Sequence, residues 1–187
     1  MGSIDRIQLN ERGDVIASTD LLALVAPTLK TSPTNWKWII LAAHSGMQGA
    51  LVCAIQDSTR TNVLDRQSAV AALAWLDNPI GDHPRQYLDH YPALLKKYRK
   101  KYPDCSITLQ QIKDLKKLHS EFRNQFTHFS PMQWSIEAAG LPRITEAALC
   151  LIEDAMQKQQ VEIHLTLEEK ERLANNLKVI RGALEIQ

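Results

Sequence analysis

Residues 38–56 read WIILAAHSGMQGALVCAIQ, and none of their side chains is charged. A run of this length approaches the roughly 20 apolar residues that a membrane-spanning helix needs. Four polar side chains and two glycines make it too polar for that role, and Ser32-Pro33 supplies an N-cap with proline at the first helical position. We therefore predict that residues 34–56 form the central buried helix of a bundle. The polar side chains are His44, Ser45, Gln48 and Gln56.

A second amphipathic pattern lies further along the chain. Thr108 and Gln111 have the spacing of a capping box, and apolar residues then recur every three or four positions up to Phe126. This pattern predicts one helix over residues 109–128, which would have roughly five turns. At about 100° per residue, its aromatic side chains face the core, while a polar face develops near its C-terminal end.

Comparable patterns favour helices in the rest of the chain. An alanine-rich segment ends at Asn78-Pro79, Pro142 precedes another apolar-periodic segment, and a second capping box precedes the last one. Together these segments predict an all-α, single-domain bundle of five to seven helices within residues 1–187. The additional helices are expected at residues 67–76, 143–158 and 167–184.

Two segments have weaker patterns. Residues 1–31 form an N-terminal extension in which polar residues 10–14 separate two apolar pairs, so a small hairpin is one interpretation. Residues 21–25 in the same extension favour a short helix. Apolar residues alternate with polar ones over residues 161–165, and this alternation predicts a short strand.

Composition limits the class of protein. The chain has 187 residues, 44% of them hydrophobic, which suffices for one domain with a sizeable core. Because the net charge is only +1, any nucleic acid would have to be bound by a local basic patch. Three cysteines without Cys-x-x-Cys spacing argue against a disulfide framework. The N-terminus lacks the apolar core of a signal peptide, so we expect a cytoplasmic protein.

The chemically richest stretch is residues 121–134, EFRNQFTHFSPMQW. Arg123, Asn124 and His128 lie on the polar flank of the helix predicted there, and Asn124 and His128 are four residues apart, hence neighbours on its surface. Ser130-Pro131 has the pattern of an N-cap followed by the first residue of a new helix. The chain is therefore expected to turn just after His128.

An Arg-Asn pair followed by three residues and a histidine, at the end of an amphipathic helix in an all-helical chain, resembles the motif of the HEPN (higher eukaryotes and prokaryotes nucleotide-binding) family. The resemblance is clear over residues 108–140 and looser over residues 34–56. It implies a homodimeric helical bundle that brings two copies of the motif together and, in many members, cleaves RNA without a metal ion. It also implies RNA or a nucleotide as substrate, and an antitoxin or a nucleotidyltransferase as partner protein.

The residue types in the motif suit that chemistry. RNA cleavage without a metal needs a base for the 2′-hydroxyl proton, and histidine is the side chain that titrates nearest to neutral pH. His128 would be this base, Arg123 would hold the phosphate charge, and Asn124 would orient His128 or the phosphate. The competing interpretation is that Arg123 and His128 only stabilise the dipole of a helix C-terminus. The protein would then be a non-catalytic interaction or nucleotide-binding module.

A basic run at residues 96–101, KKYRKK, provides a second candidate region. Its side chains could bind phosphates, although a solvated helix end explains the same charges. The candidate substrate-binding residues are Lys97, Arg99, Lys100 and Lys116. His44 is expected either to face the site or to be a hydrogen-bonded core residue. The sequence has no metal-ligand spacing and no Gly-rich phosphate loop, so we predict neither a metal nor a cofactor.

Overall fold

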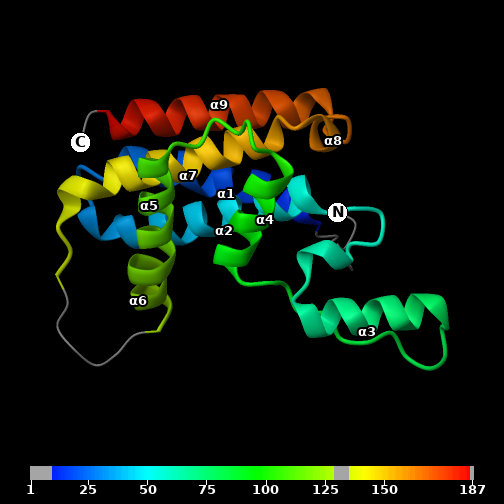
Figure 1. Cartoon of the computed structure of the whole chain (residues 1–187). Coiled ribbons are helices and arrows are strands. Elements are labelled where there is room, and N and C mark those ends of the chain that lie inside the picture. Colours follow the sequence, from blue (N-terminus) through cyan, green and yellow to red (C-terminus); the bar gives the residue numbers. More distant parts are fainter. Residues whose placement is uncertain (1–9, 129–134, 186–187) are drawn as a thin grey trace, which may run out of the picture.

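The computed structural model describes residues 10–128 and 135–185, which are predominantly helical (Figure 1). The longer helices are α1 (Glu11–Val25), α2 (Trp36–Ile55), α3 (Arg66–Asp77), α4 (Tyr91–Lys101), α5 (Leu109–Lys117), α7 (Leu141–Met156) and α9 (Leu167–Leu184). Two single-turn helices, α6 (Asn124–Thr127) and α8 (Gln159–Glu162), complete the α-helical set in the described ranges. A π-helical segment, Leu118–Arg123, joins α5 to α6. The predicted all-α bundle is therefore confirmed.

Helix α2 is the centre of the bundle, as its uncharged sequence predicts. It packs against α1, α4 and α7, and most of its side chains are buried. Within the described residues, Pro33–Ile55 is the one stretch long and apolar enough to cross a membrane, but 72% of its apolar window is buried inside the protein. A Cβ atom at Gly46 would lie 3.0 Å from Ile152 Cδ1 and 3.3 Å from Ser18 Cβ, so glycine permits the close approach of α1 and α7 here.

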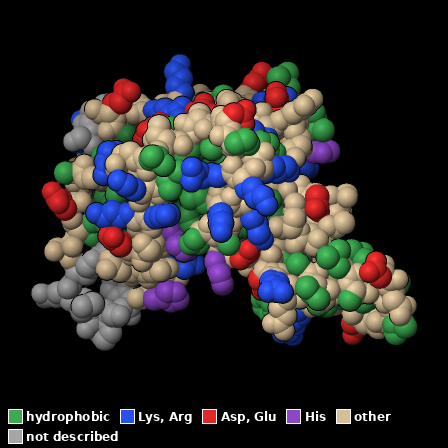
Figure 2. All heavy atoms as spheres, in the orientation of Figure 1, with side chains coloured by type: hydrophobic (Ala, Val, Ile, Leu, Met, Phe, Trp, Pro, Cys, Tyr) green, Lys and Arg blue, Asp and Glu red, His purple; other side chains and the backbone are tan. Residues whose placement is uncertain are grey.

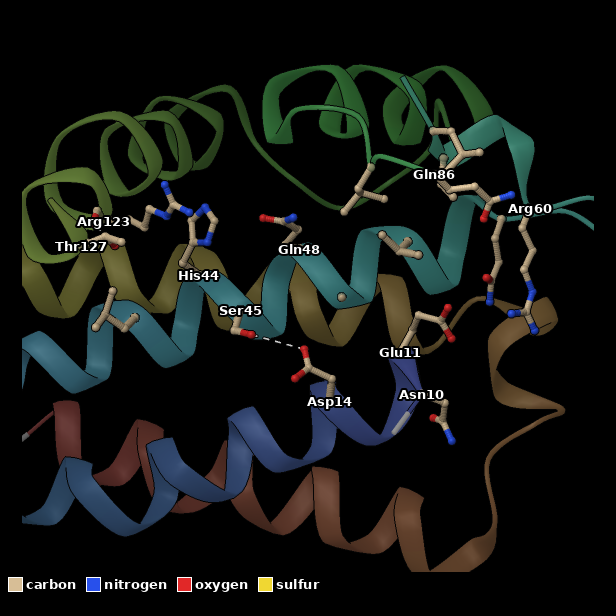
Figure 3. Close-up of a pocket in the computed structure, with 17 residues that line it drawn as sticks. Asn10, Glu11, Asp14, His44, Ser45, Gln48, Arg60, Gln86, Arg123 and Thr127 are labelled. Atoms are coloured by element: carbon tan, nitrogen blue, oxygen red, sulfur yellow. Dashed lines mark hydrogen bonds between the residues drawn. The ribbon is translucent and has the colours of Figure 1, made fainter. Parts of the chain in front are cut away.

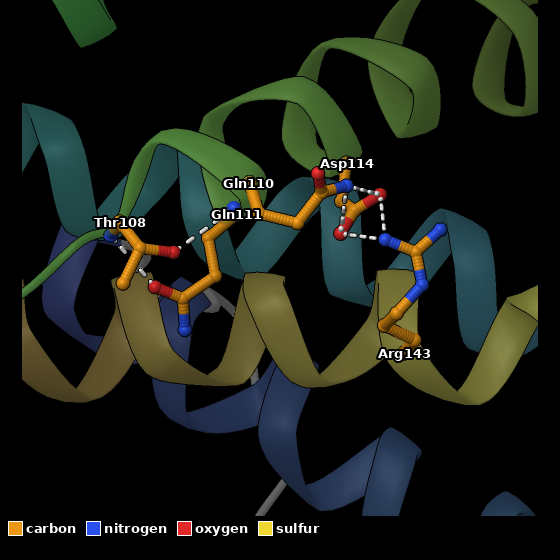
Figure 4. A network of polar contacts seen from close by, with 5 residues as sticks. All are labelled: Thr108, Gln110, Gln111, Asp114 and Arg143. Carbon is orange, nitrogen blue, oxygen red and sulfur yellow. Dashed lines mark hydrogen bonds and ion pairs between the residues drawn. The ribbon is translucent and has the colours of Figure 1, made fainter.

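The helix that carries the motif is held at its start and in its middle. The Thr108 side chain accepts a hydrogen bond from the Gln111 N–H, and the Gln111 side chain accepts one from the Thr108 N–H, which confirms the capping box. Three residues further on, the buried carboxylate of Asp114 accepts from Arg143 of α7, with Nη1 2.6 Å from Oδ1 (Figure 4). Because a buried carboxylate needs a partner, this ion pair fixes α5 against α7.

Helix α3 stands out from the bundle, and residues 78–90 return along it (Figure 1). We call residues 65–90 the arm. The Asp65 side chain caps α3 by accepting from the Ser68 N–H at 2.8 Å. The returning segment is held by the Tyr87 N–H, which donates to the Ser68 hydroxyl, and by Trp75 Nε1, which donates to the Gly81 carbonyl. The arm is thus an ordered hairpin of helix and extended chain.

Helix α4 connects the arm to the core. The hydroxyl of the buried Tyr98 donates to Asp154 of α7. Lys101 Nζ lies 3.1 Å from the carbonyl oxygen of Ala54 and 3.0 Å from that of Ile55, at the C-terminal end of α2. Since the last carbonyls of a helix have no partner within it, Lys101 supplies the missing hydrogen bonds.

The structure confirms most of the predicted helices and overturns two local predictions. The helices predicted over residues 34–56, 67–76, 109–128, 143–158 and 167–184 are present, with ends shifted by at most a few residues. In the part of the N-terminal extension that is described, the hairpin is wrong: Asn10 caps α1 by accepting from the Gly13 N–H at 2.8 Å, so the polar residues start a helix. The strand predicted at residues 161–165 is also wrong, because α8 and a turn occupy this segment. The Ser130-Pro131 helix start lies outside the described residues.

Candidate functional site

A groove of about 800 Å³ runs along the polar side of α2 (Figure 3). Its lining comes from α2, the start of α1, the segment around α6, and the base of the arm. The polar and charged lining residues are Asn10, Glu11, Asp14, His44, Ser45, Gln48, Gln56, Arg60, Gln86, Arg123 and Thr127. Figure 2 shows a hollow between the bundle and the arm, with histidine side chains gathered at its edge. The polar residues that interrupt the apolar α2 sequence thus face a solvent-accessible groove.

Two histidines form a direct pair at one end of this groove. His44 Nε2 lies 2.8 Å from His119 Nδ1, so one ring donates a hydrogen bond to the other. The ring of Tyr91 lies 5.0 Å from that of His119 and 5.6 Å from that of His44, measured between centroids. Within the described residues, the buried Tyr91 hydroxyl has no hydrogen-bond partner. Three rings from α2, α4 and the π-helical segment therefore meet at a place where the fold buries polar atoms.

The environment keeps both imidazoles neutral at pH 7. Burial, with smaller contributions from His119 and Arg123, lowers the pKa of His44 from 6.5 to about 4. Burial, followed by the charges of Arg123 and His90, also lowers the pKa of His119. A neutral imidazole can accept a proton. An anion bound beside Arg123 would offset these effects and raise the pKa of both rings, which would couple anion binding to proton uptake.

Arg123 lines the groove together with His44, and its positive charge contributes to lowering the pKa of both histidines. Its Nη1 donates to Asn124 Oδ1 at 2.9 Å, and Asn124 Nδ2 donates in turn to the Ser120 carbonyl at 3.3 Å. Arg123 and His119 both belong to the π-helical segment, which packs against α2. Such segments occur frequently at functional sites, because the wider turn changes the direction of the side chains that follow. The π turn therefore places Arg123 in the groove lining and His119 in hydrogen-bond contact with the groove residue His44.

The structure brings together two of the three motif residues predicted from the sequence. Arg123 and Asn124 are in contact, as stated above. His128 is exposed at the C-terminal end of α6, and its backbone N–H donates to the Asn124 carbonyl at 2.8 Å. Its side chain is not part of the groove lining in the described chain. Within the described part of the chain, the histidine that lines the groove together with Arg123 is therefore His44.

The four basic residues predicted to bind substrate lie away from the groove. Lys97 Nζ is 2.7 Å from Asp89 Oδ2 and 3.1 Å from the Leu64 carbonyl, so it holds the arm to α4. Arg99, Lys100 and Lys116 are exposed and do not line the groove described here. The second arginine of the groove is instead Arg60, which sequence reasoning did not select.

The groove residues outside the motif differ in how visible they are in the sequence. His44 was considered there, either as facing the site or as a hydrogen-bonded core residue, because polar side chains in a buried helix need partners or a cavity. The pairing of His44 with His119 joins positions 75 residues apart and has no local signal. Arg60 has a left-handed backbone with φ 58°, a conformation unfavourable for side chains other than glycine. Strained backbone of this kind is concentrated at functional sites, and here it lies at the groove.

The described residues give less support to metal-dependent chemistry or to a cysteine nucleophile. In residues 10–128 and 135–185, no group of three or more His, Cys, Asp or Glu side chains is placed to hold a metal ion. Burial raises the pKa of Cys53 to about 12 and that of Cys150 to about 11, so both thiols stay protonated and are poor nucleophiles at neutral pH.

The groove therefore combines a cation with neutral imidazoles, which suits acid–base chemistry on a bound anion. Comparison with protein-family models, with curated proteins and with solved structures found no match for this chain. A function must accordingly be argued from the groove and from the motif.

Proposed function

We propose that the protein is a metal-independent endoribonuclease of the HEPN type, acting as a cytoplasmic homodimer. The observation that carries this proposal is the placement of the Arg123 guanidinium at the end of an open groove beside the paired imidazoles of His44 and His119. A guanidinium is the side chain best suited to bind a phosphodiester, because it offers several N–H donors in one plane. Imidazoles supply the proton transfers.

The reaction needs no water and no metal ion. The 2′-oxygen of the substrate attacks the adjacent phosphorus while a base removes its proton, and the bond from phosphorus to the 5′-oxygen of the next nucleotide breaks. An acid protonates that leaving oxygen. The products are a 2′,3′-cyclic phosphate and a 5′-hydroxyl end. Arg123 stabilises the charge that builds up on the phosphoryl oxygens in the transition state, and Asn124 holds the guanidinium in place through the contact described above.

Two sources of imidazole are available for the base and the acid. The first is the pair formed by His44 and His119, next to Arg123 in the same chain. The second is His128 of the motif, which is exposed beyond α6 and would serve a groove shared between two copies of the chain. A homodimer of the HEPN type would bring the two motifs together and provide both a base and an acid.

The test is cleavage of a labelled RNA oligonucleotide in EDTA. Wild type should release a product ending in a 2′,3′-cyclic phosphate, and a 2′-deoxy substitution at the scissile nucleotide should stop the reaction. Arg123→Ala should lower the rate by about 10²- to 10³-fold. The exposed Arg85→Ala is the matched control and should leave the rate unchanged. Intact RNA under all conditions with wild-type protein would disprove the proposal.

Separate histidine variants assign the roles. If His44→Gln and His119→Gln slow cleavage while His128→Ala does not, the pair within one chain performs the proton transfers. The reverse result assigns them to His128. Exposed His164→Ala serves as the control for loss of a histidine outside the groove.

A second candidate function is a non-catalytic interaction module, and the specific observation in its favour is the apolar surface of the arm. Val70, Leu73 and Ile80 expose 61%, 45% and 77% of their surface. In this case the groove would bind a nucleotide or RNA without cleaving it. Binding of a labelled RNA that weakens in Arg123→Ala, with no cleavage product at any time, would support this function over the first.

A further inference from the structure

Helix α3 has an apolar surface that the protein does not cover. Residues 68–76, SAVAALAWL, contain no charged side chain, although the helix stands outside the bundle. Its inner side, with Ser68 and Ala72 buried, packs on the rest of the arm. Its outer side exposes Val70 and Leu73, and Figure 2 shows hydrophobic side chains spread over the arm. A helix that is apolar on both sides is normally covered on both sides.

The exposed side of α3 carries a single stripe with charges only at its ends, and Arg66 at the base of the helix also lines a pocket with Lys97 and Lys100 of α4. Arg66, Val70, Leu73 and Asp77 follow one another at intervals of four, three and four residues. At about 100° per residue they fall within roughly 60° of one another on the helix surface. This is the spacing of the seam along which two helices pack in a coiled coil.

The two end charges are unfavourable for α3 by itself. Arg66 is the first residue of the helix and Asp77 is the last. The N-terminus of a helix carries a partial positive charge and the C-terminus a partial negative charge, so each of these side chains lies at the end that repels it. Within the described residues neither forms an ion pair. An antiparallel helix placed against the stripe would bring its negative C-terminal end to Arg66 and its positive N-terminal end to Asp77, so both charges would become favourable.

We propose that the outer side of α3 binds the α3 helix of a second copy of this chain, antiparallel and about a two-fold axis. Arg66 then faces Asp77 of the partner subunit, and Val70 faces Leu73 of the partner subunit. The contact extends over about 18 Å, the length of a helix of 12 residues. The stripe fits a second copy of itself. Read along α3, its side chains are positive, apolar, apolar and negative, and this order is complementary to the same order read in reverse.

The interface belongs to the arm and does not depend on the ribonuclease proposal. Four residues of one helix, with the neighbouring Ile80, form a contact smaller than the roughly 800 Å² per partner of a stable complex. The dimer is therefore expected to form reversibly, with a dissociation constant in the micromolar range. Loss of RNA cleavage leaves this dimer intact, and loss of the dimer is measured without RNA.

Sedimentation equilibrium of the full chain over a wide concentration range provides the first test. Wild type should shift from monomer to dimer, and Leu73→Glu should raise the dissociation constant by at least tenfold because it places a carboxylate against Val70 of the partner subunit. Leu167→Glu is the matched control, since Leu167 is 73% exposed at the start of α9 and lies outside the arm. It should leave the dissociation constant unchanged.

Charge reversal provides the sharper test. Arg66→Glu and Asp77→Arg should each weaken self-association at least tenfold, because like charges then meet at both ends of the interface. An equimolar mixture of the two variants should form a heterodimer, and the double variant R66E/D77R should associate as well as wild type. Both substitutions improve the match to the dipole of α3, so neither is expected to unfold the arm.

Several results would overturn the proposal. A wild-type chain that stays monomeric at about millimolar concentration has no such interface. A dimer that Leu73→Glu leaves unchanged uses another surface, and single variants that fail to associate when mixed would exclude the antiparallel pairing. Co-sedimentation of a monomeric wild type with phosphatidylcholine vesicles, abolished by Leu73→Glu, would assign the stripe to a membrane instead.

Discussion

The groove and the arm depart from the usual distribution of side chains in opposite ways. At the end of the groove the fold buries the His44 ring and the unpaired Tyr91 hydroxyl, and it partly buries the His119 ring. On the arm it exposes apolar groups, Val70 and Leu73, to solvent. Stability alone favours the reverse arrangement in both places. Proteins accept such unfavourable arrangements mainly at binding and catalytic sites. The two regions therefore point to two different functions.

The largest effect is expected from the pH dependence of the groove. The folded protein holds the pKa of His44 at about 4, against 6.5 for the free side chain, chiefly through burial. Between these two values the unfolded chain binds a proton that the folded chain does not, so the free energy of unfolding falls as the pH decreases through this range. The loss attributable to His44 is about 3 kcal/mol. It is measured by chemical denaturation at a series of pH values from 7 to 4.

The variant His44→Gln removes the titrating ring and can still hydrogen-bond to His119. Its loss of stability between pH 7 and pH 4 should be smaller than that of wild type by about 3 kcal/mol. His164→Gln, at an exposed position, should follow the wild-type curve. Equal slopes for wild type and His44→Gln would mean that the ring is solvated in the folded state, and the groove would no longer contrast with the arm.

A somewhat smaller effect should come from the ion pair that positions the motif helix. Arg143→Leu leaves the Asp114 carboxylate buried without its cation, and the protein should lose about 1–3 kcal/mol of stability. The value stays below that of a fully buried pair because the Arg143 side chain is 56% exposed. Thermal unfolding measures the change. The double variant Asp114→Leu with Arg143→Leu should recover part of the loss, since it removes the unpaired charge.

The sequence predicted the helices well because each has its own local signal. The capping box at Thr108 and the uncharged run of α2 are contained within a few turns of chain, and both were confirmed. The errors came where short patterns are ambiguous. Val161 and Ile163 alternate with polar residues as in a strand, yet Val161 is the buried residue of α8 and Ile163 is 69% exposed in the turn that follows.

The candidate site was less predictable, because its parts are distant in the sequence. Arg123 and Asn124 belong to a local motif and were identified, and the structure places them in contact. His119 lies one turn before Arg123 and has no motif of its own. Its hydrogen bond to His44 depends on how α2 packs against the π-helical segment, and no local pattern encodes that packing. The end charges of α3 were visible in the sequence, but their lack of a partner became evident only from the arrangement of the arm.

Two glycines test how tightly the helices behind the groove are packed. Gly46→Ala would bring a methyl group against Ile152 and Ser18, and it should destabilise the protein by about 1–2 kcal/mol. Gly182→Ala is the matched change, since Gly182 lies in α9 with open space around it, and it should stabilise the protein by about 0.5–1 kcal/mol. Thermal unfolding of both variants measures the difference. A neutral Gly46→Ala variant would show that α1 and α7 can move away from α2.

The smallest change in stability is expected from a substitution on the arm. Leu73 is 45% exposed, so Leu73→Ala should change the stability of dilute protein by less than about 0.5 kcal/mol. Leu115→Ala, at a fully buried position of α5, should cost about 2–5 kcal/mol.

The informative comparison repeats both measurements at high protein concentration. If α3 pairs with a second copy, association stabilises wild type but not Leu73→Ala, and the small difference between them grows with concentration while the Leu115→Ala deficit persists. A Leu73→Ala effect independent of concentration would mean that the exposed leucine serves no partner.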